Sequence, residues 1–369
     1  MHTKKLKAGI IGCGGIAEQK YFPALKANDD LCEITAFCSG NEANAAKAAK
    51  AHGSPGAKVY KDYKELLKDK DVDVVYVLTP NTLHAPITIE AFAAGKHVMC
   101  EKPMAATTED AEQMLAAWEK SGKLFTVGYQ GRFRPEVQAL HRAVKAGALG
   151  EIYYAKATAI RRRAVPTWGV FPNKALQGGG PLIDIGTHAL DMTLWLMDNY
   201  TPHSVTGSVF FKLGNLPEAV EGNLFGPWDP NTYEVEDSAF GFIKMKNGAT
   251  IVLESSWALN VSESREASTT LCGTKAGAEI RSGISFPKDE LIFNRGAHGQ
   301  LLDETLCKDG KVAYFGGQSE DPGVLEARQW LNALHGEGEP LVKPEQAFMV
   351  TKLLDSIYQS AESGKEVLF

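Results

Sequence analysis

The first 127 residues alternate between short apolar runs and longer runs rich in alanine and lysine. Strand-like runs such as LKAGIIG (6–12) and VDVVYVLTP (72–80) are separated by helix-like runs such as EANAAKAAKAHG (42–53). Strands that alternate with helices are typical of a parallel sheet, because the crossover between parallel strands is usually made by a helix. We therefore predict an α/β domain with a doubly wound parallel sheet over residues 1–127.

The second half of the chain, residues 128–369, has a different pattern. Strand-like runs follow one another there: EIYYAKATAIRRR, HSVTGSVFFKL, SAFGFIKMK, ATIVLESSW and STTLCGTKAGAEI. The dipeptide Asn247-Gly248 is typical of a tight hairpin turn, since both residues tolerate positive φ values. This pattern predicts an α+β domain with a mostly antiparallel sheet.

Helical periodicity appears again near the end of the sequence. Amphipathic helices are expected at about 322–335 and 344–363, and residues 215–237 are expected to form a long loop. Loops of that length are more often functional than idle.

Composition excludes several classes of protein. A chain of 369 residues with 44% hydrophobic residues is long enough for two domains with their own cores. Its net charge is −6, and the one basic run, Arg161-Arg162-Arg163, is too short for a nucleic-acid footprint. No run approaches the roughly 18 apolar residues of a membrane span, and no secretion signal is present. We expect a soluble, cytoplasmic protein that binds neither nucleic acid nor membrane.

The six cysteines are scattered, without a CxxC pair or a histidine-rich cluster beside them. This spacing predicts neither a disulfide framework nor a structural metal site, and it fits a reducing compartment. The cysteines are Cys13, Cys32, Cys38, Cys100, Cys272 and Cys307.

A glycine-rich stretch, Gly12 to Ala17, follows the first apolar strand and fits the pattern G-x-G-x-x-A. The first glycine permits a tight turn, and the second lets the backbone approach a pyrophosphate at the start of a helix. A purely structural glycine turn would look similar, but the strand before it favours a dinucleotide. We predict that Gly12, Gly14, Gly15 and Ile16 bind the cofactor.

The end of the second strand bears on which dinucleotide is bound. NAD-binding folds usually place an acidic residue there, about 20 positions after the glycines, to hold the ribose 2′-hydroxyl. Here the strand ends in Ser39 and continues to Asn41, both of which can donate hydrogen bonds to a phosphate. Since no arginine follows, the choice between NAD and NADP stays open, with a slight preference for NADP.

The tripeptide Glu101-Lys102-Pro103 ends another predicted parallel strand, where open α/β sheets bind their ligands. An exposed Glu-Lys pair is the simpler interpretation. A cationic nicotinamide nearby and partial burial would both disfavour the ammonium form of Lys102 and make it a general acid or base.

The segment GGGPLIDIGTHALDMTLWLM (178–197) carries an aspartate and a histidine four residues apart, Asp184 and His188. In a helix this spacing places both on one face. Three interpretations compete: a helix cap with a buried histidine, a metal pair that lacks further ligands, and acid/base or substrate-orienting work.

Arginine and tryptophan after the first long strand of the second domain suggest a further part of a substrate pocket. On an extended strand Arg161 and Arg163 share a face, while Arg162 points the other way. Arginine forks and aromatic rings suit polyhydroxylated ligands, although the run could equally be a solvated strand end. We predict Arg162, Arg163 and Trp168 as substrate residues.

Several of these pieces together resemble the Gfo/Idh/MocA oxidoreductases, named for glucose-fructose oxidoreductase and inositol dehydrogenase. The matching pieces are GIIGCGGIA, TPNTLHAPITIEAFAAGKHVMCEKPMA, VGYQGRFRP, GGGPLIDIGTHALDMTLWLM and VEDSAFGFIKMKNGATIVLESSW. The resemblance implies an N-terminal Rossmann domain and a C-terminal domain, 128–369, with a large open sheet. It also implies a homodimer or homotetramer built through that sheet.

The resemblance also implies roles for single residues. Lys102 matches the catalytic lysine of the family, and Asp184 and His188 match its partners. Residues expected along the cofactor are Thr79, Pro80, Asn81, His84 and Glu101.

The sequence departs from the commonest family pattern at two places. Ser39 stands where NAD-using members tend to have aspartate, and Gln130-Gly131 replaces a frequent Asn-Arg. Tyr129 and Arg132, on either side of that change, are expected substrate contacts.

The function that this implies is an NAD(P)-dependent oxidoreductase acting on a sugar, a sugar derivative or inositol. Lys102 or His188 would remove the hydroxyl proton, and Asp184 would orient the substrate. Two alternatives are a redox glycosidase of the same family that holds NAD tightly and a dinucleotide-sensing regulator. A regulator needs the glycine loop but not the acid/base residues, whose joint presence favours an enzyme.

Overall fold

The computed structural model describes residues 4–286, 288–306 and 321–369, so Cys307 lies outside the described residues. The chain divides into two compact units. The first contains Met1–Phe133 and Glu320–Thr351, and the second contains Arg134–Ser319 and Lys352–Phe369. The first unit is thus assembled from both ends of the sequence.

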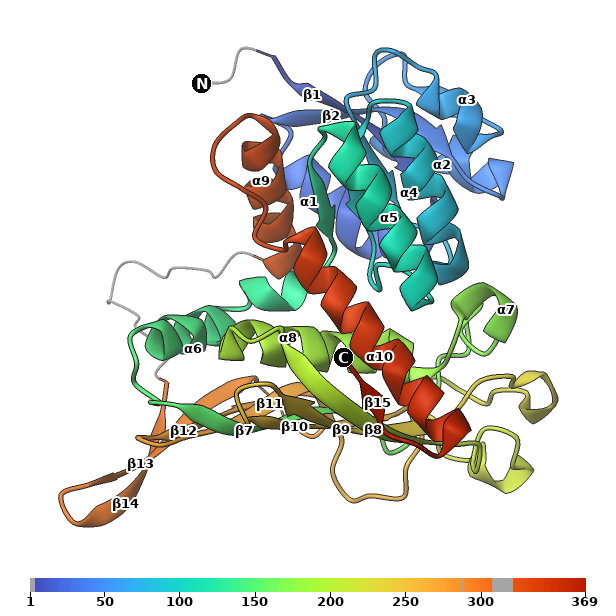
Figure 1. Ribbon diagram of the computed structural model, residues 1–369. Coiled ribbons are helices and arrows are strands. Elements are labelled where there is room, and N and C mark those ends of the chain that lie inside the picture. Colours follow the sequence, from blue (N-terminus) through green and yellow to red (C-terminus); the bar gives the residue numbers. More distant parts are fainter. Residues whose placement is uncertain (1–3, 287, 307–320) are drawn as a thin grey trace, which may run out of the picture. The chain divides into compact units, whose positions relative to one another are not determined.

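The first unit is built on a six-stranded parallel sheet with the order β3-β2-β1-β4-β5-β6. Two of its strands, β1 and β2, are labelled in Figure 1. Its strands are β1 (Leu6–Ile11), β2 (Cys32–Cys38), β3 (Lys58–Tyr60), β4 (Val74–Val77), β5 (His97–Cys100) and β6 (Phe125–Val127). The helices are α1 (Phe22–Ala27), α2 (Glu42–His52), α3 (Tyr63–Leu67), α4 (His84–Ala93), α5 (Thr108–Ser121) and α9 (Pro322–Leu334). This strand order is that of the dinucleotide-binding fold, and the predicted doubly wound sheet is confirmed.

Burial explains why these runs form central strands. Every residue of Val74–Val77 is buried, as expected of a strand covered by helices on both faces of a parallel sheet. The helix α9 adds Trp330 and Leu331 to the core around β1, β2 and α1. A segment from the far end of the chain therefore completes the core of the first unit.

The second unit contains a nine-stranded sheet with the order β14-β13-β12-β11-β7-β10-β9-β8-β15. The strands are β7 (Ile152–Ile160), β8 (Pro202–Phe210), β9 (Ser238–Met245), β10 (Thr250–Ser256), β11 (Arg265–Gly273), β12 (Gly277–Arg281), β13 (Glu290–Ala297), β14 (Gln300–Thr305) and β15 (Val367–Leu368). Only β7 and β10 pair in parallel, so the predicted mostly antiparallel sheet is confirmed.

The hairpin predicted at Asn247-Gly248 joins β9 to β10, and Gly248 has a φ of 93°. The run STTLCGTKAGAEI was expected to be one strand, and this was wrong. It forms the end of β11 and most of β12, which pair with each other across residues 274–276. The hairpin β13-β14 was not predicted, because neither strand has an alternating apolar pattern: β13 has one short apolar run, Leu291–Phe293, followed by polar and small residues, and β14 is mostly exposed.

Helices cover one face of this sheet. They are α6 (Pro135–Lys145), α8 (Thr187–Met197) and α10 (Pro344–Ser363). The first residues of α10 belong to the first unit. The short helix α7 (Lys174–Gln177) lies in the segment between β7 and α8. On the α8 side, Ala155, Ala157 and Ala159 of β7 are completely buried, and Thr193 of α8 bonds to Thr269 of β11 at 2.9 Å. Small side chains on β7 thus let the helix lie close to the sheet.

Candidate functional site

The glycine loop after β1 contains one tightly packed glycine, Gly12, and two glycines that border open space, Gly14 and Gly15. Gly12 has a φ of 105°, and a Cβ atom added there would lie 2.4 Å from the carbonyl oxygen of Leu78. Its N–H donates to the carbonyl of Cys38 at 2.8 Å. Cβ atoms added at Gly14 and Gly15 would meet nothing within 4 Å. The loop fits a pyrophosphate, because its backbone is open at these two positions and leads into a helix.

A cavity of about 210 Å³ lies beside this loop. It is lined by Cys13, Gly14, Gly15, Glu18, Asn44 and Lys47. Sequence reasoning found no arginine after β2, but α2 brings Lys47 to the glycines. The predicted cofactor residue Asn41 caps α2, since its Oδ1 accepts from the N–H of Ala43 at 3.0 Å. Ser39 is half-buried after the end of β2.

His84 joins the turns that follow two neighbouring strands. Its imidazole is fully buried at the start of α4, with Nδ1 2.8 Å from the carbonyl oxygen of Pro103 and Nε2 2.9 Å from that of Thr79. Burial lowers the pKa of His84 below its ordinary value. The ring therefore ties the turn after β4 to the turn that carries Lys102. Asn81, also predicted along the cofactor, is buried in the short helical turn before α4, next to the half-buried Pro80.

Glu101 fixes the backbone of Lys102 at the carboxyl end of β5. The Oε2 atom accepts from the backbone N–H of Lys102 at 2.7 Å. The Oε1 atom accepts from Lys20 Nζ and from Tyr21 Oη, each at 3.0 Å. Glu101 and Lys20 are both buried, whereas Lys102 is half-buried.

Lys20 lies at the centre of a buried charged cluster. Besides Glu101, its Nζ contacts Glu326 Oε2 of α9 at 2.9 Å and Gln130 Oε1 at 3.0 Å. Burial by itself lowers the pKa of Lys20, but the two carboxylates outweigh it, and the pKa rises above its ordinary value. Sequence reasoning missed Lys20 and Glu326, because no local pattern marks residues that meet only in the folded unit.

Tyr129 and Arg132, predicted as substrate contacts, are both buried within the first unit. The guanidinium Nη1 of Arg132 donates to Gln346 Oε1 at 2.6 Å and to the carbonyl of Leu341 at 3.3 Å. These bonds hold the segment before α10 and its first turn against the residues that follow β6.

In the second unit, Asp184 lies in a single turn of π-helix, Leu182–Gly186, that leads directly into α8. Helical geometry is therefore continuous from Asp184 to His188, as the one-face interpretation requires. Asp184 is 6% exposed, and its Oδ2 accepts from the indole Nε1 of Trp257 at 3.1 Å. It does not cap the helix start, and His188 is half-buried rather than enclosed.

Glu236 holds the turn from which this helix starts. Its carboxylate accepts from the N–H groups of Gly180 and Leu182, at 2.9 and 3.1 Å, and from Tyr358 Oη at 2.8 Å. A Cβ atom added at Gly180 would lie 2.3 Å from the Glu236 carbonyl oxygen. Glycine is thus required for the close approach that positions Asp184. Glu236 belongs to the motif VEDSAFGFIKMKNGATIVLESSW, but the sequence analysis assigned it no role.

The arginine that acts on Asp184 is Arg161, which was not among the predicted substrate residues. Its Nε donates to Glu266 Oε2 at 2.7 Å, and its Nη1 donates to the carbonyl of Ala164 at 3.1 Å. Burial by itself lowers the pKa of Arg161. The carboxylates of Glu266 and, to a smaller extent, Asp184 raise it, and the net effect is a pKa above the ordinary value. Arg161 therefore brings a fixed positive charge to the surroundings of Asp184.

The two predicted arginines lie differently. Arg162 is exposed, and its backbone N–H donates to Ser264 Oγ at 2.9 Å. Arg163 donates through Nε to the carbonyl of Ala219 at 3.1 Å and through Nη2 to Asn260 Oδ1 at 2.7 Å. The guanidinium of Arg163 thus connects three segments of the second unit.

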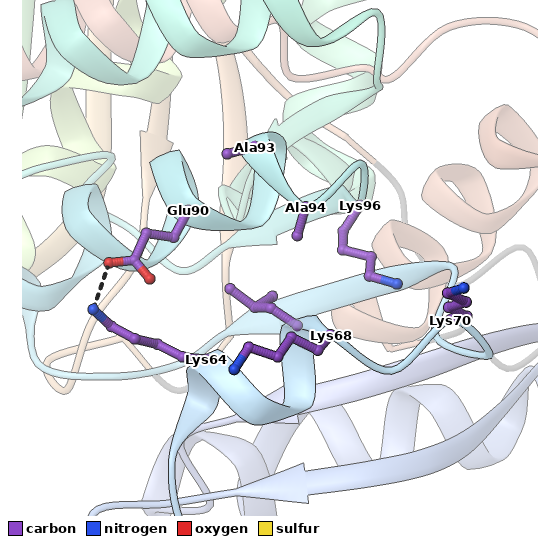
Figure 2. A pocket seen from close by; sticks show the side chains of 8 residues that line it. Lys64, Lys68, Lys70, Glu90, Ala93, Ala94 and Lys96 are labelled. Atoms are coloured by element: carbon purple, nitrogen blue, oxygen red, sulfur yellow. Dashed lines mark ion pairs between the residues drawn. The ribbon is translucent and has the colours of Figure 1, made fainter.

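A hollow of about 590 Å³ in the first unit is lined by lysines and does not include the glycine loop. Figure 2 shows the side chains that line it. Lys64 pairs with Glu90 at 3.1 Å, and Lys96 donates to the carbonyls of Asp69 and Val72 at 2.6 and 2.8 Å. The ammonium groups of Lys64 and Lys96 thus bind oxygen atoms of the protein itself, so we do not assign the hollow as the functional site.

Residues 4–286, 288–306 and 321–369 contain no group of three or more His, Cys, Asp or Glu side chains placed to hold a metal ion. Within the same ranges, each helix is too short or too polar to span a bilayer.

Comparison with known proteins assigns the chain to a family. The family model described as an oxidoreductase family with an NAD-binding Rossmann fold matches residues 6–129, and the model of its C-terminal alpha/beta domain matches residues 141–369. The chain belongs to the Gfo/Idh/MocA oxidoreductase family. The resemblance drawn from its motifs is thereby confirmed.

Members of the Gfo/Idh/MocA family that resemble this chain include sugar dehydrogenases. D-glucoside 3-dehydrogenase of Escherichia coli is 36% identical over all of this chain and 98% of its own length. Levoglucosan dehydrogenase of Pseudarthrobacter phenanthrenivorans is 30% identical over 51% of this chain and 50% of its own length. Among solved structures, the glycerol complex of aldose-aldose oxidoreductase from Caulobacter crescentus is 26% identical, with a TM-score of 0.79, and covers 99% of this chain and 100% of that one.

Proposed function

We propose that the protein is an NAD(P)-dependent dehydrogenase that oxidises a CH–OH group of a sugar. The observation that carries the proposal is the placement of Lys102. It follows directly after a parallel strand, fixed by Glu101, in the same sheet whose first strand ends in an open glycine loop. The full-length relative that acts on D-glucosides supports a glucoside or a closely related sugar as substrate.

The residues of the chain divide the chemistry between them. The nicotinamide supplies the hydride acceptor when it is bound. The hydroxyl proton of the substrate passes to Lys102 or to His188 as the C–H bond breaks. Asp184, held by Trp257 and facing the charge of Arg161, accepts hydrogen bonds from sugar hydroxyls and orients them. Among the predicted sugar contacts, Trp168 is half-exposed and Arg162 is exposed.

A substrate screen tests this function. We expect methyl D-glucosides, and to a smaller extent free aldoses and inositol, to reduce NAD⁺ or NADP⁺ with a rise in absorbance of the reduced nicotinamide. A redox glycosidase would release the aglycone without net reduction of the cofactor, and a dinucleotide sensor would bind the cofactor without turnover. Either of these results contradicts the proposal.

We propose that the site accepts a 2′-phosphate and that NADP is used at least as well as NAD. Ser39 and Asn41 leave the end of β2 without an acid, and Lys47 supplies a positive charge beside the glycine loop. The substitution Ser39→Asp is expected to lower kcat/KM for NADP⁺ by about 100-fold, because a carboxylate repels the phosphate. The value for NAD⁺ should change little. Ser39→Ala, which adds no charge, is the control, and an equal loss with both cofactors would refute the assignment.

We also propose that two copies associate through the face of the nine-stranded sheet that α8 does not cover. Phe240 and Phe242 of β9 lie there with Phe210 of β8, and Phe210 and Phe240 are in edge-to-face contact. Exposed aromatic rings on a sheet face are typical of an interface.

We place the protein in a reducing compartment such as the cytoplasm, since the five described cysteines form no disulfide.

A further inference from the structure

Two aromatic rings of the second unit form an exposed corner that takes no part in the proposed proton transfer. Trp168 is 50% exposed and Phe225 is 37% exposed. Their ring centroids lie 4.7 Å apart, and the ring planes meet at 86°. The edge of one ring therefore faces the other, and a broad apolar surface stays accessible.

Hydrogen bonds between two loops hold this corner in place. Thr167 Oγ1 donates to the carbonyl of Phe225 at 2.7 Å, and the N–H of Leu224 donates to the carbonyl of Arg163 at 3.0 Å. Asn223 accepts from the N–H of Val165 at 2.8 Å and donates to its carbonyl at 3.0 Å. The rings thus lie on loops that are fixed to each other, so that a ligand would meet a preformed surface.

The corner is connected to Asp184 through a short series of aromatic rings. Trp168 contacts Phe171 with a centroid distance of 6.0 Å, and Phe171 contacts Trp257 at 6.2 Å. The indole of Trp257 donates to Asp184 at 3.1 Å. The corner therefore lies two ring contacts away from the indole that bonds to Asp184.

We propose that Trp168 and Phe225 form a subsite for the aglycone of a glycoside, that is, for the ring attached to the anomeric oxygen of the reacting sugar. The proposal rests on the proposed sugar dehydrogenase function and adds that glycosides are preferred to free sugars. Aromatic faces attract the C–H edges of aromatic and sugar rings, and both Trp168 and Phe225 keep part of their surface exposed. An aglycone of one ring fits this surface, whereas a methyl group is too small to reach both rings.

Calorimetric titration of phenyl and methyl D-glucosides, both anomers of each, tests the subsite on the full chain saturated with NADH or NADPH. The reduced cofactor prevents turnover, so binding is measured directly. We expect a phenyl glucoside to bind roughly 5- to 10-fold more tightly than the methyl glucoside of the same anomer. Trp168→Ala should reduce this ratio to below twofold, because the phenyl ring loses more contact area than the methyl group does.

Tyr153→Ala is the matched control, because Tyr153 is an exposed aromatic side chain of the same unit outside the corner. It should keep the full ratio. Equal binding of phenyl and methyl glucosides by the unaltered protein, or equal weakening of both by Trp168→Ala, would overturn the subsite, as would a failure to bind any glucoside. Tight phenyl glucoside binding without oxidation in the substrate screen would instead refute the dehydrogenase function and leave the subsite standing.

Discussion

Lys102→Ala is expected to lower kcat by about 10²- to 10⁴-fold, the usual contribution of a general acid or base, with the dissociation constant for NAD(P)H nearly unchanged. The reason is that the Lys102 amine accepts the hydroxyl proton in the transition state, whereas the cofactor is held by the glycine loop after β1. Steady-state oxidation of the best substrate and fluorescence titration with NADH and NADPH measure the two quantities separately.

Two further variants define the role of Lys102. Lys102→Arg keeps the positive charge, but a guanidinium does not give up its proton near neutral pH, so this variant should be about as inactive as Lys102→Ala. Lys70→Ala removes an exposed lysine of the same unit and should retain full activity. If Lys102→Arg kept most of the activity, charge alone would explain the residue, and the proton-transfer role would be wrong.

Lys20→Met is expected to lower the free energy of unfolding by about 3–5 kcal/mol, because it leaves two buried carboxylates without their cation. Glu101 and Glu326 each lie within 3.0 Å of the Lys20 ammonium, and all three side chains are buried. Lys26→Met is the control, since Lys26 pairs with Asp29 on the surface at 3.2 Å. Exposed pairs of this kind contribute at most about 1 kcal/mol. Urea unfolding of both variants measures the difference, and equal losses would show that the buried cluster is not special.

The same cluster has a pH dependence with a defined sign. The pKa of Lys20 is raised in the folded protein, so its stabilising contribution is complete below the ordinary lysine pKa and is lost as pH rises through the folded-state value. Unfolding curves of the unaltered protein and Lys20→Met should therefore be furthest apart near neutral pH. They should approach each other only in strongly alkaline solution.

Local patterns predicted the parts of the fold that depend on neighbours in sequence. The glycine loop, the strand that ends before Glu101 and the Asn247-Gly248 hairpin each carry their signal within a few residues, and the structure has the predicted elements at all three. The helical continuity between Asp184 and His188 also follows from one segment. In each case the residues of the segment itself determine its backbone conformation and its burial.

Contacts between distant segments could not be predicted in the same way. Lys20 and Glu101 are 81 positions apart, and Glu236 and Tyr358 are 122 positions apart. Nothing in the surroundings of any of these residues marks it as one of a pair. Arg161, which follows β7, bonds to Glu266 of β11, 105 positions further along the chain, and no local pattern marks this pair either.

The contribution of α9 to the first unit has a consequence for synthesis of the protein. The sheet β1–β6 and the glycine loop are translated long before Glu326, Trp330 and Leu331 leave the ribosome. Until then Lys20 and Glu101 lack their third charged partner, and part of the apolar core stays uncovered. Nascent chains therefore pass through a period in which the dinucleotide-binding unit exists without its final helix, which makes that interval a natural point of engagement for chaperones.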